Sequence, residues 1–263
     1  MTRHRLSTSI AALLLAVGAH AAPAASNYAV LSLVGDKLDV VTYQPAIGSQ
    51  LDNNSHIPVV LPQDELDLSA LKAINRTLKA SVPGAQVTLL AASRPEDFAD
   101  QDRIFSGDRV TLPAEIDAAM RREGATALLL VTKHHGEARL QLADGITGSG
   151  RVAGLGFYLD GRMHLKNQDT GARSIGYIAP FVNIDVSLVD LATGTVMHRK
   201  TISTGQVIGA YHSADGTNAW DALSGAEKVS VLTNMLTTEV AAAVPALLGG
   251  RADTAEAAAT AAR

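Results

Sequence analysis

The chain of 263 residues contains no cysteine, so its fold must be held together without a disulfide bond or a Cys-ligated metal. The same absence excludes a thiolate nucleophile and a lipidated amino-terminal cysteine. Stability must therefore come from a buried apolar core, and the chain is long enough for one large domain or two small ones. We expect a single α/β domain over residues 22–250.

The amino terminus has the three parts of a cleavable export signal. Arg3 and Arg5 supply a positive region, and Ile10 to Val17 supply an apolar core. Ala19-His20-Ala21 has the small-x-small pattern of a cleavage site. The apolar core is shorter than the ~20 residues that a helix needs to cross a bilayer. We therefore predict a signal peptide over residues 1–21, cleaved after about Ala21. An exported protein without disulfides is typical of a bacterial envelope, so the predicted location is the periplasm.

The formal net charge of −4 becomes more negative when Arg3 and Arg5 are removed with the signal. Binding to a phosphate backbone requires clustered Lys and Arg, so no nucleic-acid partner is expected. No later segment is predicted to span a membrane, because the most apolar run, Val240 to Leu248, is short and contains Pro245.

Hydrophobic periodicity predicts helices and strands mixed along the first half of the chain. Two β-rich runs, 28–34 and 38–43, are separated by a Gly-Asp-Lys turn that indicates a hairpin, and the prolines of residues 44–63 indicate a loop. A helix is expected from Leu66 to Val82, because its apolar residues recur at helical spacing. A short strand over 86–91 is expected to follow.

Residues 93–109 are polar and are predicted to form a mobile surface loop. The next helix is expected from Pro113 to Gly124. The continuous apolar run 127–132 then suits a strand that is covered on both faces.

The segment 139–207 is β-rich, with hairpin turns predicted at Asp160-Gly161 and at Asp190–Gly194. A long helix follows, stopped by Gly249-Gly250, and the Ala-rich residues 251–263 are expected to be a frayed tail. The elements together predict an α/β fold of the α+β kind, in which about three helices flank a mixed, largely antiparallel sheet.

Two segments resemble parts of known periplasmic domains. Residues 118–131, AAMRREGATALLLV, look like the helix-Gly-Ala-strand element of domains of the TolB amino-terminal and curli-secretion (CsgG-like) type, and residues 184–196, IDVSLVDLATGTV, resemble their late hairpin. The resemblance implies a compact α/β domain that docks onto envelope partners without catalysis. The chain departs from that pattern in its early hairpin, in an extra β segment at 139–166 and in its lack of a lipidation cysteine.

The densest group of possible metal ligands is His134, His135 and Glu137. Adjacent residues of a strand point to opposite faces, so both histidines reach one metal only if the strand ends in a turn here. We expect a solvated strand end and no metal or other cofactor. The activated-serine motif Gly-x-Ser-x-Gly is absent, and we assign no catalytic residue.

The segment around Asp160-Gly161 carries apolar groups on both of its predicted faces. Phe157 has Leu155 and Leu159 as same-face companions suited to a core, whereas Tyr158 has only glycines beside it. Either the protein covers both faces itself, or one face is a contact surface. We expect Tyr158 at the contact surface. The residues predicted to bind a protein partner are Phe157, Tyr158, Met163 and Trp220.

The sequence therefore supports two functional hypotheses. The first is a non-catalytic envelope protein, an adaptor or assembly domain that binds another protein. The alternative is a periplasmic enzyme or small-molecule binder whose site is assembled from distant residues, such as His134, Glu137 and Asp190. A deep pocket of convergent polar groups would favour the second hypothesis, and a shallow apolar patch would favour the first.

Overall fold

A computed structural model describes residues 27–35, 37–45, 52–61, 65–92, 94–98 and 101–261. From Gly250 onward, and at Pro95, only the backbone is described. The predicted signal peptide and its cleavage site lie outside these residues.

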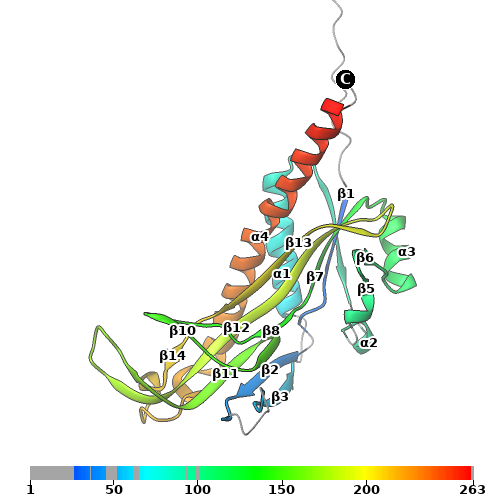
Figure 1. Ribbon diagram of the computed structural model, residues 1–263. Helices are drawn as coiled ribbons and strands as arrows, with labels where there is room; N and C mark the ends of the chain where they lie inside the picture. Colours follow the sequence, from blue (N-terminus) through cyan, green and yellow to red (C-terminus); the bar gives the residue numbers. More distant parts are fainter. Residues whose placement is uncertain are drawn as a thin grey trace, which may run out of the picture.

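The long strand β12 (Arg173–Asp190) organises the fold, because two groups of strands pair with it one after the other along the same edge. The first group, which we name the parallel wing, lies along its carboxyl-terminal half in the order β4 (Gln86–Ala91), β1 (Asn27–Ser32), β7 (Ala127–Lys133). The second group, the outer wing, lies along its amino-terminal half in the order β3 (Ser55–Val60), β2 (Lys37–Thr42), β11 (Arg151–Lys166). The result is one twelve-stranded sheet with a division in it (Figure 1).

The opposite edge of β12 pairs with β13 (Thr195–Gly205) and with the short β14 (Ile208–Gly209). Two-residue strands extend the sheet beyond β13, namely β6 (Arg109–Val110) and β5 (Phe105–Ser106). The short strand β8 (His135–Glu137) pairs with the beginning of β11, whereas β9 (Leu140–Leu142) and β10 (Gly145–Thr147) form a separate two-stranded sheet.

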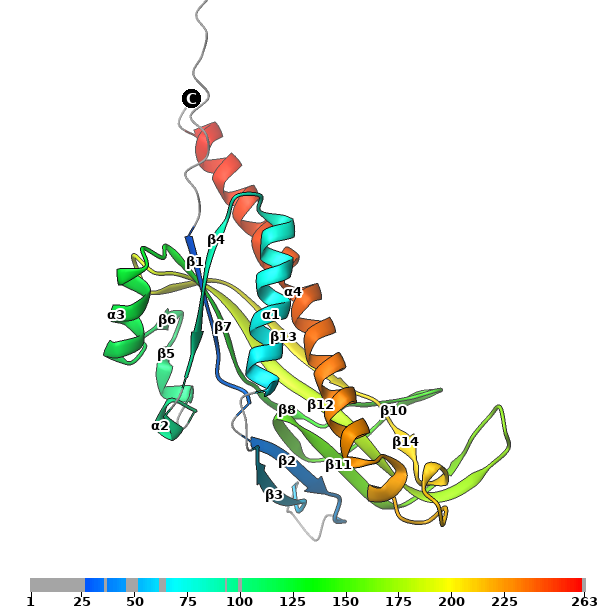
Figure 2. The same cartoon turned by 180° about the vertical axis from the view of Figure 1, so that it is seen from behind.

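The longer helices cover the two faces of the parallel wing (Figure 2). The helices α1 (Glu65–Ser81) and α4 (Gly225–Ala261) lie side by side on one face, whereas α3 (Ala114–Arg122) and the single turn α2 (Pro95–Phe98) lie on the other. Side chains of β1 alternate between these layers: Val30 packs in the α1–α4 core and Leu31 in the α3 core. The predicted α+β class, with a large and mostly antiparallel sheet in a single domain, is confirmed.

Helix α4 begins with a capping box. The backbone N–H of Ser224 donates to the Glu227 carboxylate (2.8 Å), and the N–H of Glu227 donates to the Ser224 hydroxyl (3.3 Å). Its backbone continues to Ala261, so the prediction that Gly249-Gly250 ends it is wrong. Each glycine costs only about 1 kcal/mol in a helix, and the following Ala-rich run has a high helical propensity.

Over Gly225–Gly249, α4 is long and apolar enough to cross a bilayer by length and composition, and no other described helix is. The sequence had predicted that no segment after the signal peptide could span a membrane, and by length and composition α4 does not fit that prediction. One third of the most apolar window is buried within the protein. Leu232, Leu236, Val240 and Val244 form a buried stripe against the sheet, which is the pattern of a surface helix of a folded domain.

The predicted hairpin between residues 28–34 and 38–43 is wrong. Both runs are strands, but β1 enters the parallel wing and β2 the outer wing. The chain changes wing at Val34 and Gly35, whose N–H groups donate to the buried Asp67 carboxylate of α1 (3.1 and 3.0 Å). A Cβ atom at Gly35 would lie 2.7 Å from an oxygen of Asp67, so this close approach requires glycine.

The described part of the polar segment 93–109, residues 94–98 and 101–109, is also more ordered than the predicted mobile loop. It contains α2, a 3₁₀ turn (Gln101–Ile104) and the two strands β5 and β6. The buried Gln101 side chain explains this order, because it donates to the carbonyl oxygens of Leu33 and Phe98 and accepts from the N–H of Lys133 (2.8 Å). A single polar residue thus joins this segment to β7.

The predicted turn at Asp160-Gly161 is a β-bulge inside β11. Asp160 accepts hydrogen bonds from the N–H groups of Arg162 and Met163 at this bulge. The true reversal lies at residues 167–172, where the N–H of Asn167 donates to the carbonyl oxygen of Ala172 (2.8 Å). The turn at Asp190–Gly194 is confirmed, with Gly194 at a φ of 70° and its N–H bonded to Asp190.

A candidate binding cleft where the sheet divides

The division of the sheet is held by Asn183 of β12, which is buried between the end of β7 and the beginning of β11. Its side-chain amide donates to the carbonyl oxygens of His134 (3.2 Å) and Val152 (3.0 Å). Its backbone carbonyl oxygen accepts from the N–H of His134 (3.0 Å). One residue thereby satisfies backbone groups of both wings at the point where they separate.

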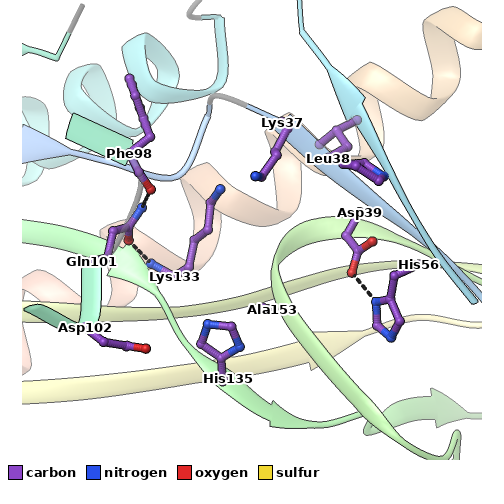
Figure 3. Close-up of a pocket in the computed structure, with 11 residues that line it drawn as sticks. Lys37, Leu38, Asp39, His56, Phe98, Gln101, Asp102, Lys133, His135 and Ala153 are labelled. Atoms are coloured by element: carbon purple, nitrogen blue, oxygen red, sulfur yellow. Dashed lines mark hydrogen bonds and ion pairs between the residues drawn. The ribbon is translucent and has the colours of Figure 1, made fainter. Parts of the chain in front are cut away.

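A cleft of about 550 Å³ lies at this division (Figure 3). The chain leaving each parallel strand contributes to it: Lys37 follows β1, Phe98 follows β4, and Lys133 ends β7. The described residues that line it are Lys37, Leu38, Asp39, His56, Pro58, Phe98, Gln101, Asp102, Lys133, His135 and Ala153. Ligands of open α/β sheets bind in crevices outside the carboxyl ends of parallel strands, and this cleft has that position.

Charged groups of both signs converge on the cleft. Figure 3 shows the side chains of Lys37 and Lys133 extending into it, with His135 and Asp102 below them. On the outer wing, Nδ1 of His56 lies 2.7 Å from Oδ2 of Asp39, on adjacent strands. The described lining contains no serine, threonine or cysteine, so it offers hydrogen bonds and charge but no hydroxyl or thiol nucleophile.

The two histidines of the candidate metal cluster diverge, as the alternation of a strand predicted. His134 turns toward Asp185 of β12 (Nδ1 to Oδ2, 3.2 Å), whereas His135 lines the cleft. Glu137 lies on β8 opposite Arg151. Among the residues that the structure describes, no three His, Cys, Asp or Glu side chains are grouped so as to hold a metal ion.

Asp190 does not join His134 and Glu137 in a composite site. It lies at the far end of β12, where its carboxylate accepts from the N–H of Ala192 in the turn before β13 (2.7 Å). The composite site is therefore wrong for these three residues. The cleft instead unites residues from five separate segments of the chain.

Tyr158 is not exposed, contrary to prediction. Tyr158 and Phe157 are each only 1% exposed and lie on opposite faces of β11. The Tyr158 ring stacks on Tyr177 with centroids 6.3 Å apart, and its hydroxyl donates to the carbonyl oxygen of Ser149 (3.0 Å). Burial raises the pKa of the Tyr158 hydroxyl, opposed by its hydrogen bonds to Ser149.

The reason is that residues 138–150 fold over the second face of β11, with Ala138 and Leu140 packing in the same cluster as Tyr158. The neighbouring Gly156, expected to leave bare backbone beside the ring, instead admits the carbonyl oxygen of Asp39. Both faces of β11 are therefore covered from within the chain.

The other two residues of the predicted partner surface are more accessible. Met163 is half-buried against the Tyr158 cluster, and Trp220 is 38% exposed. The Trp220 ring meets Phe157 edge to face with centroids 5.8 Å apart, and the ammonium of Lys228 lies 4.2 Å from its centre. Trp220 thus lies on the Phe157 face of β11 and Met163 on the Tyr158 face, so the two do not form one surface. Partner binding by either residue stays a prediction.

Lys228 is itself nearly buried and donates to the carbonyl oxygen of Leu223. Burial lowers its pKa below the ordinary value of 10.5, and the carboxylates of Asp221 and Glu227 only partly offset this. At a pH between the lowered pKa of the folded protein and 10.5, Lys228 is therefore more protonated in the unfolded chain than in the folded one. The free energy of unfolding consequently increases as the pH rises through this range.

We predict that the free energy of unfolding of the wild type increases relative to that of Lys228→Met as the pH rises toward 10.5, the ordinary pKa of lysine. Urea titrations of both proteins across that range measure the difference, and the ionisation of tyrosines affects both alike. A difference that is constant with pH, or that falls, would contradict the lowered pKa.

Comparisons with known proteins identify no family for the chain. No family model and no curated protein matches it, so the resemblance to TolB amino-terminal and CsgG-like domains is not confirmed. Several solved structures are similar to the chain at low identity. A PelC dodecamer from Paraburkholderia phytofirmans is 15% identical, with 84% of this chain and 86% of that chain covered and a TM-score of 0.34.

Two further structures match at a similar level. A protein from Xanthomonas campestris assigned to the DUF330 family model is 10% identical over 89% of this chain and 92% of that chain, with a TM-score of 0.38. A protein from Helicobacter pylori, described as a homologue of a neuraminyllactose-binding hemagglutinin, is 11% identical over 84% of each chain, with a TM-score of 0.36. At these TM-scores neither family nor function follows.

Proposed function

We propose that the protein is a non-catalytic binding module of the bacterial envelope, exported to the periplasm, which takes up an extended segment of another protein along strand β3. The observation that supports this most directly is the state of β3 itself. It is the outermost strand of the outer wing, and β2 is its only partner among the described strands.

The exposed side chains of β3 are unusually apolar for an edge. Ile57 is 55% exposed, Val59 42% and Val60 77%. An open sheet edge presents unpaired N–H and C=O groups, and proteins normally protect it with charges or with a covering segment. An uncovered apolar edge is what β-strand addition uses, since main-chain hydrogen bonds give affinity and side chains give specificity.

The cleft gives the edge a source of specificity. His56 and Pro58 alternate with Ile57 and Val59 along β3, and both line the cleft. A segment added beside β3 would direct alternate side chains toward the cleft and toward the apolar face. The cations and carboxylates of the cleft would then select polar or charged residues at every second position.

Pro58 limits this addition. It has no N–H, so one donor is missing in the middle of the strand. Proline on an edge strand is a known device against uncontrolled pairing between sheets. The edge is therefore suited to a short segment that tolerates one missing hydrogen bond.

The test is site-specific photocrosslinking in cells that export the protein. A photoreactive residue at Val60 should give a discrete adduct with a partner, identified by mass spectrometry, and Ile57→Lys together with Val59→Lys should remove that adduct. A photoreactive residue at Leu68, which is 46% exposed on α1, is the matched control and should give none. Absence of an adduct at Val60, or the same adducts from both positions, would refute the proposal.

Small-molecule binding in the cleft is the second candidate, favoured by the convergence of both lysines with His135. Small-molecule binding predicts that a compound from a panel of metabolites, or a ligand recovered from the protein by dialysis, raises the melting temperature of the wild type. The same compound should not raise the melting temperature of His135→Ala. Ile57 and Val59 are not among the residues that line the cleft, so the Ile57→Lys/Val59→Lys variant should still bind such a ligand. These opposite responses separate the two candidates.

A further inference from the structure

Beyond the bulge at Asp160, the ends of β11 and β12 leave the sheet as a two-stranded hairpin, seen as the projecting yellow-green loop in Figures 1 and 2. From His164 to Lys166 the first strand pairs only with Arg173 to Ile175 of the second. One face of this ribbon is packed, because Leu165 contacts the Tyr158 cluster and Ser174 opposite it is buried. The other face, which carries His164, Lys166 and Ile175, is exposed, so its composition is not explained by packing.

The pairing of the hairpin places like charges opposite each other. Lys166 faces Arg173 directly across the two strands, and His164 faces Ile175 on the same side. Like charges in directly opposed positions destabilise a sheet. Neither cation forms an ion pair or a side-chain hydrogen bond with any residue that the structure describes, although the chain as a whole carries a charge of −4.

These side chains line a groove rather than a convex surface. A groove of about 590 Å³ lies between the hairpin and the turn at residues 215–217, and His164, Lys166, Arg173 and Ile175 are part of its wall. Ile175 is 49% exposed between the cations. The one carboxylate in the wall, Asp215, already accepts from the Ser213 hydroxyl (2.9 Å) and from the N–H groups of Thr217 (2.9 Å) and Asn218 (3.0 Å).

We propose that this groove is a second binding site, which takes an acidic, extended segment of a partner protein. Carboxylates of the segment would pair with Lys166 and Arg173 and relieve their repulsion, and an apolar side chain would cover Ile175. A concave wall admits an extended chain, whereas a flat bilayer surface would meet only the rim. This site is separate from β3 and does not depend on the function proposed for that strand.

The test uses a fluorescein-labelled decaglutamate peptide as the probe and the full mature chain as the receptor. The wild type should bind the peptide at ~50 mM salt and lose affinity as salt is raised. The double variant Lys166→Glu/Arg173→Glu should bind at least ~10-fold more weakly, as expected for the loss of two charge-assisted contacts. The control Lys72→Glu/Arg76→Glu, on exposed positions of α1, makes the same change in net charge and should stay within ~2-fold of wild type.

The single variant Lys166→Glu provides a readout that is independent of the probe. It places a carboxylate directly opposite the Arg173 guanidinium, so it should raise the unfolding midpoint by ~1–2 °C while weakening binding. Equal losses in the hairpin and control variants would overturn the proposal, because binding would then follow net charge alone. Failure of the wild type to bind decaglutamate would also overturn it, as would stronger hairpin-dependent binding to phosphatidylglycerol vesicles than to the peptide.

Discussion

Replacing Tyr158 by alanine should destabilise the protein by about 3–5 kcal/mol, the range for truncating a buried aromatic ring. The ring is 1% exposed and stacks on Tyr177, so its removal leaves a cavity between β11 and residues 138–150. Its hydroxyl also anchors Ser149, whose N–H and carbonyl oxygen both bond to it. Urea denaturation of the two proteins gives the difference directly.

Two conservative variants separate the parts of this effect. Tyr158→Phe keeps the ring and loses the contacts with Ser149, so it should cost about 1 kcal/mol. Tyr177→Phe removes a buried hydroxyl for which the structure shows no hydrogen-bond partner, and it should be neutral or slightly stabilising. A Tyr158→Ala protein as stable as the wild type would mean that this ring lies at the surface after all.

Replacing Gly156 by alanine should cost about 3 kcal/mol or more, at the upper end for inserting a methyl group into a packed site. The new Cβ would lie 1.9 Å from the carbonyl oxygen of Asp39 and 2.8 Å from the Phe181 ring. The Asp39 oxygen belongs to the backbone of β2, so the only way to relieve the overlap is to move β2 away from β11. The variant should therefore loosen β2 and β3 before the rest of the sheet.

Hydrogen exchange measured by mass spectrometry locates this loosening. Amides of residues 37–42 and 55–60 should exchange faster in Gly156→Ala, while those of 127–133 keep their protection. Gly161→Ala is the matched control on the same strand, since a Cβ there meets nothing within 4 Å, and it should stay within about 0.5 kcal/mol of wild type. Unchanged exchange in β2 and β3 of the Gly156 variant would contradict the close approach.

The elements that could be predicted from the sequence are those whose signal is local. The strand 86–91 and the helix ending near Ser81 lie where their periodicity placed them, and 127–133 is a strand buried on both faces. The pairing of strands was less predictable, because β1 pairs with strands that begin about sixty and one hundred residues later. A turn signal such as Asp160-Gly161 also fits a bulge, and only the partner strand decides between them.

The cleft was missed for the same reason. Asp39 and His56 meet because β3 pairs with β2, but the prolines around Ser55–Val60 had indicated a loop. Pro58 is compatible with a strand only at an edge, and the sequence contains no sign of where the edge of the sheet lies. Lys37, Gln101 and Lys133 carry no motif and share one site only through the division of the sheet.

The shared strand β12 has a consequence for how the molecule is made. During synthesis the strands of both wings are complete before residue 173 is added. Until β12 follows, β7 and β11 each have an edge without its hydrogen-bonding partner, because β12 pairs with both. Unpaired edges attract strands of other chains, and the interval before residue 190 emerges is therefore the period of greatest danger from aggregation. A chain truncated just before β12 would retain most of its apolar residues and still lack a fold, which makes the last third of the sequence the decisive one for solubility.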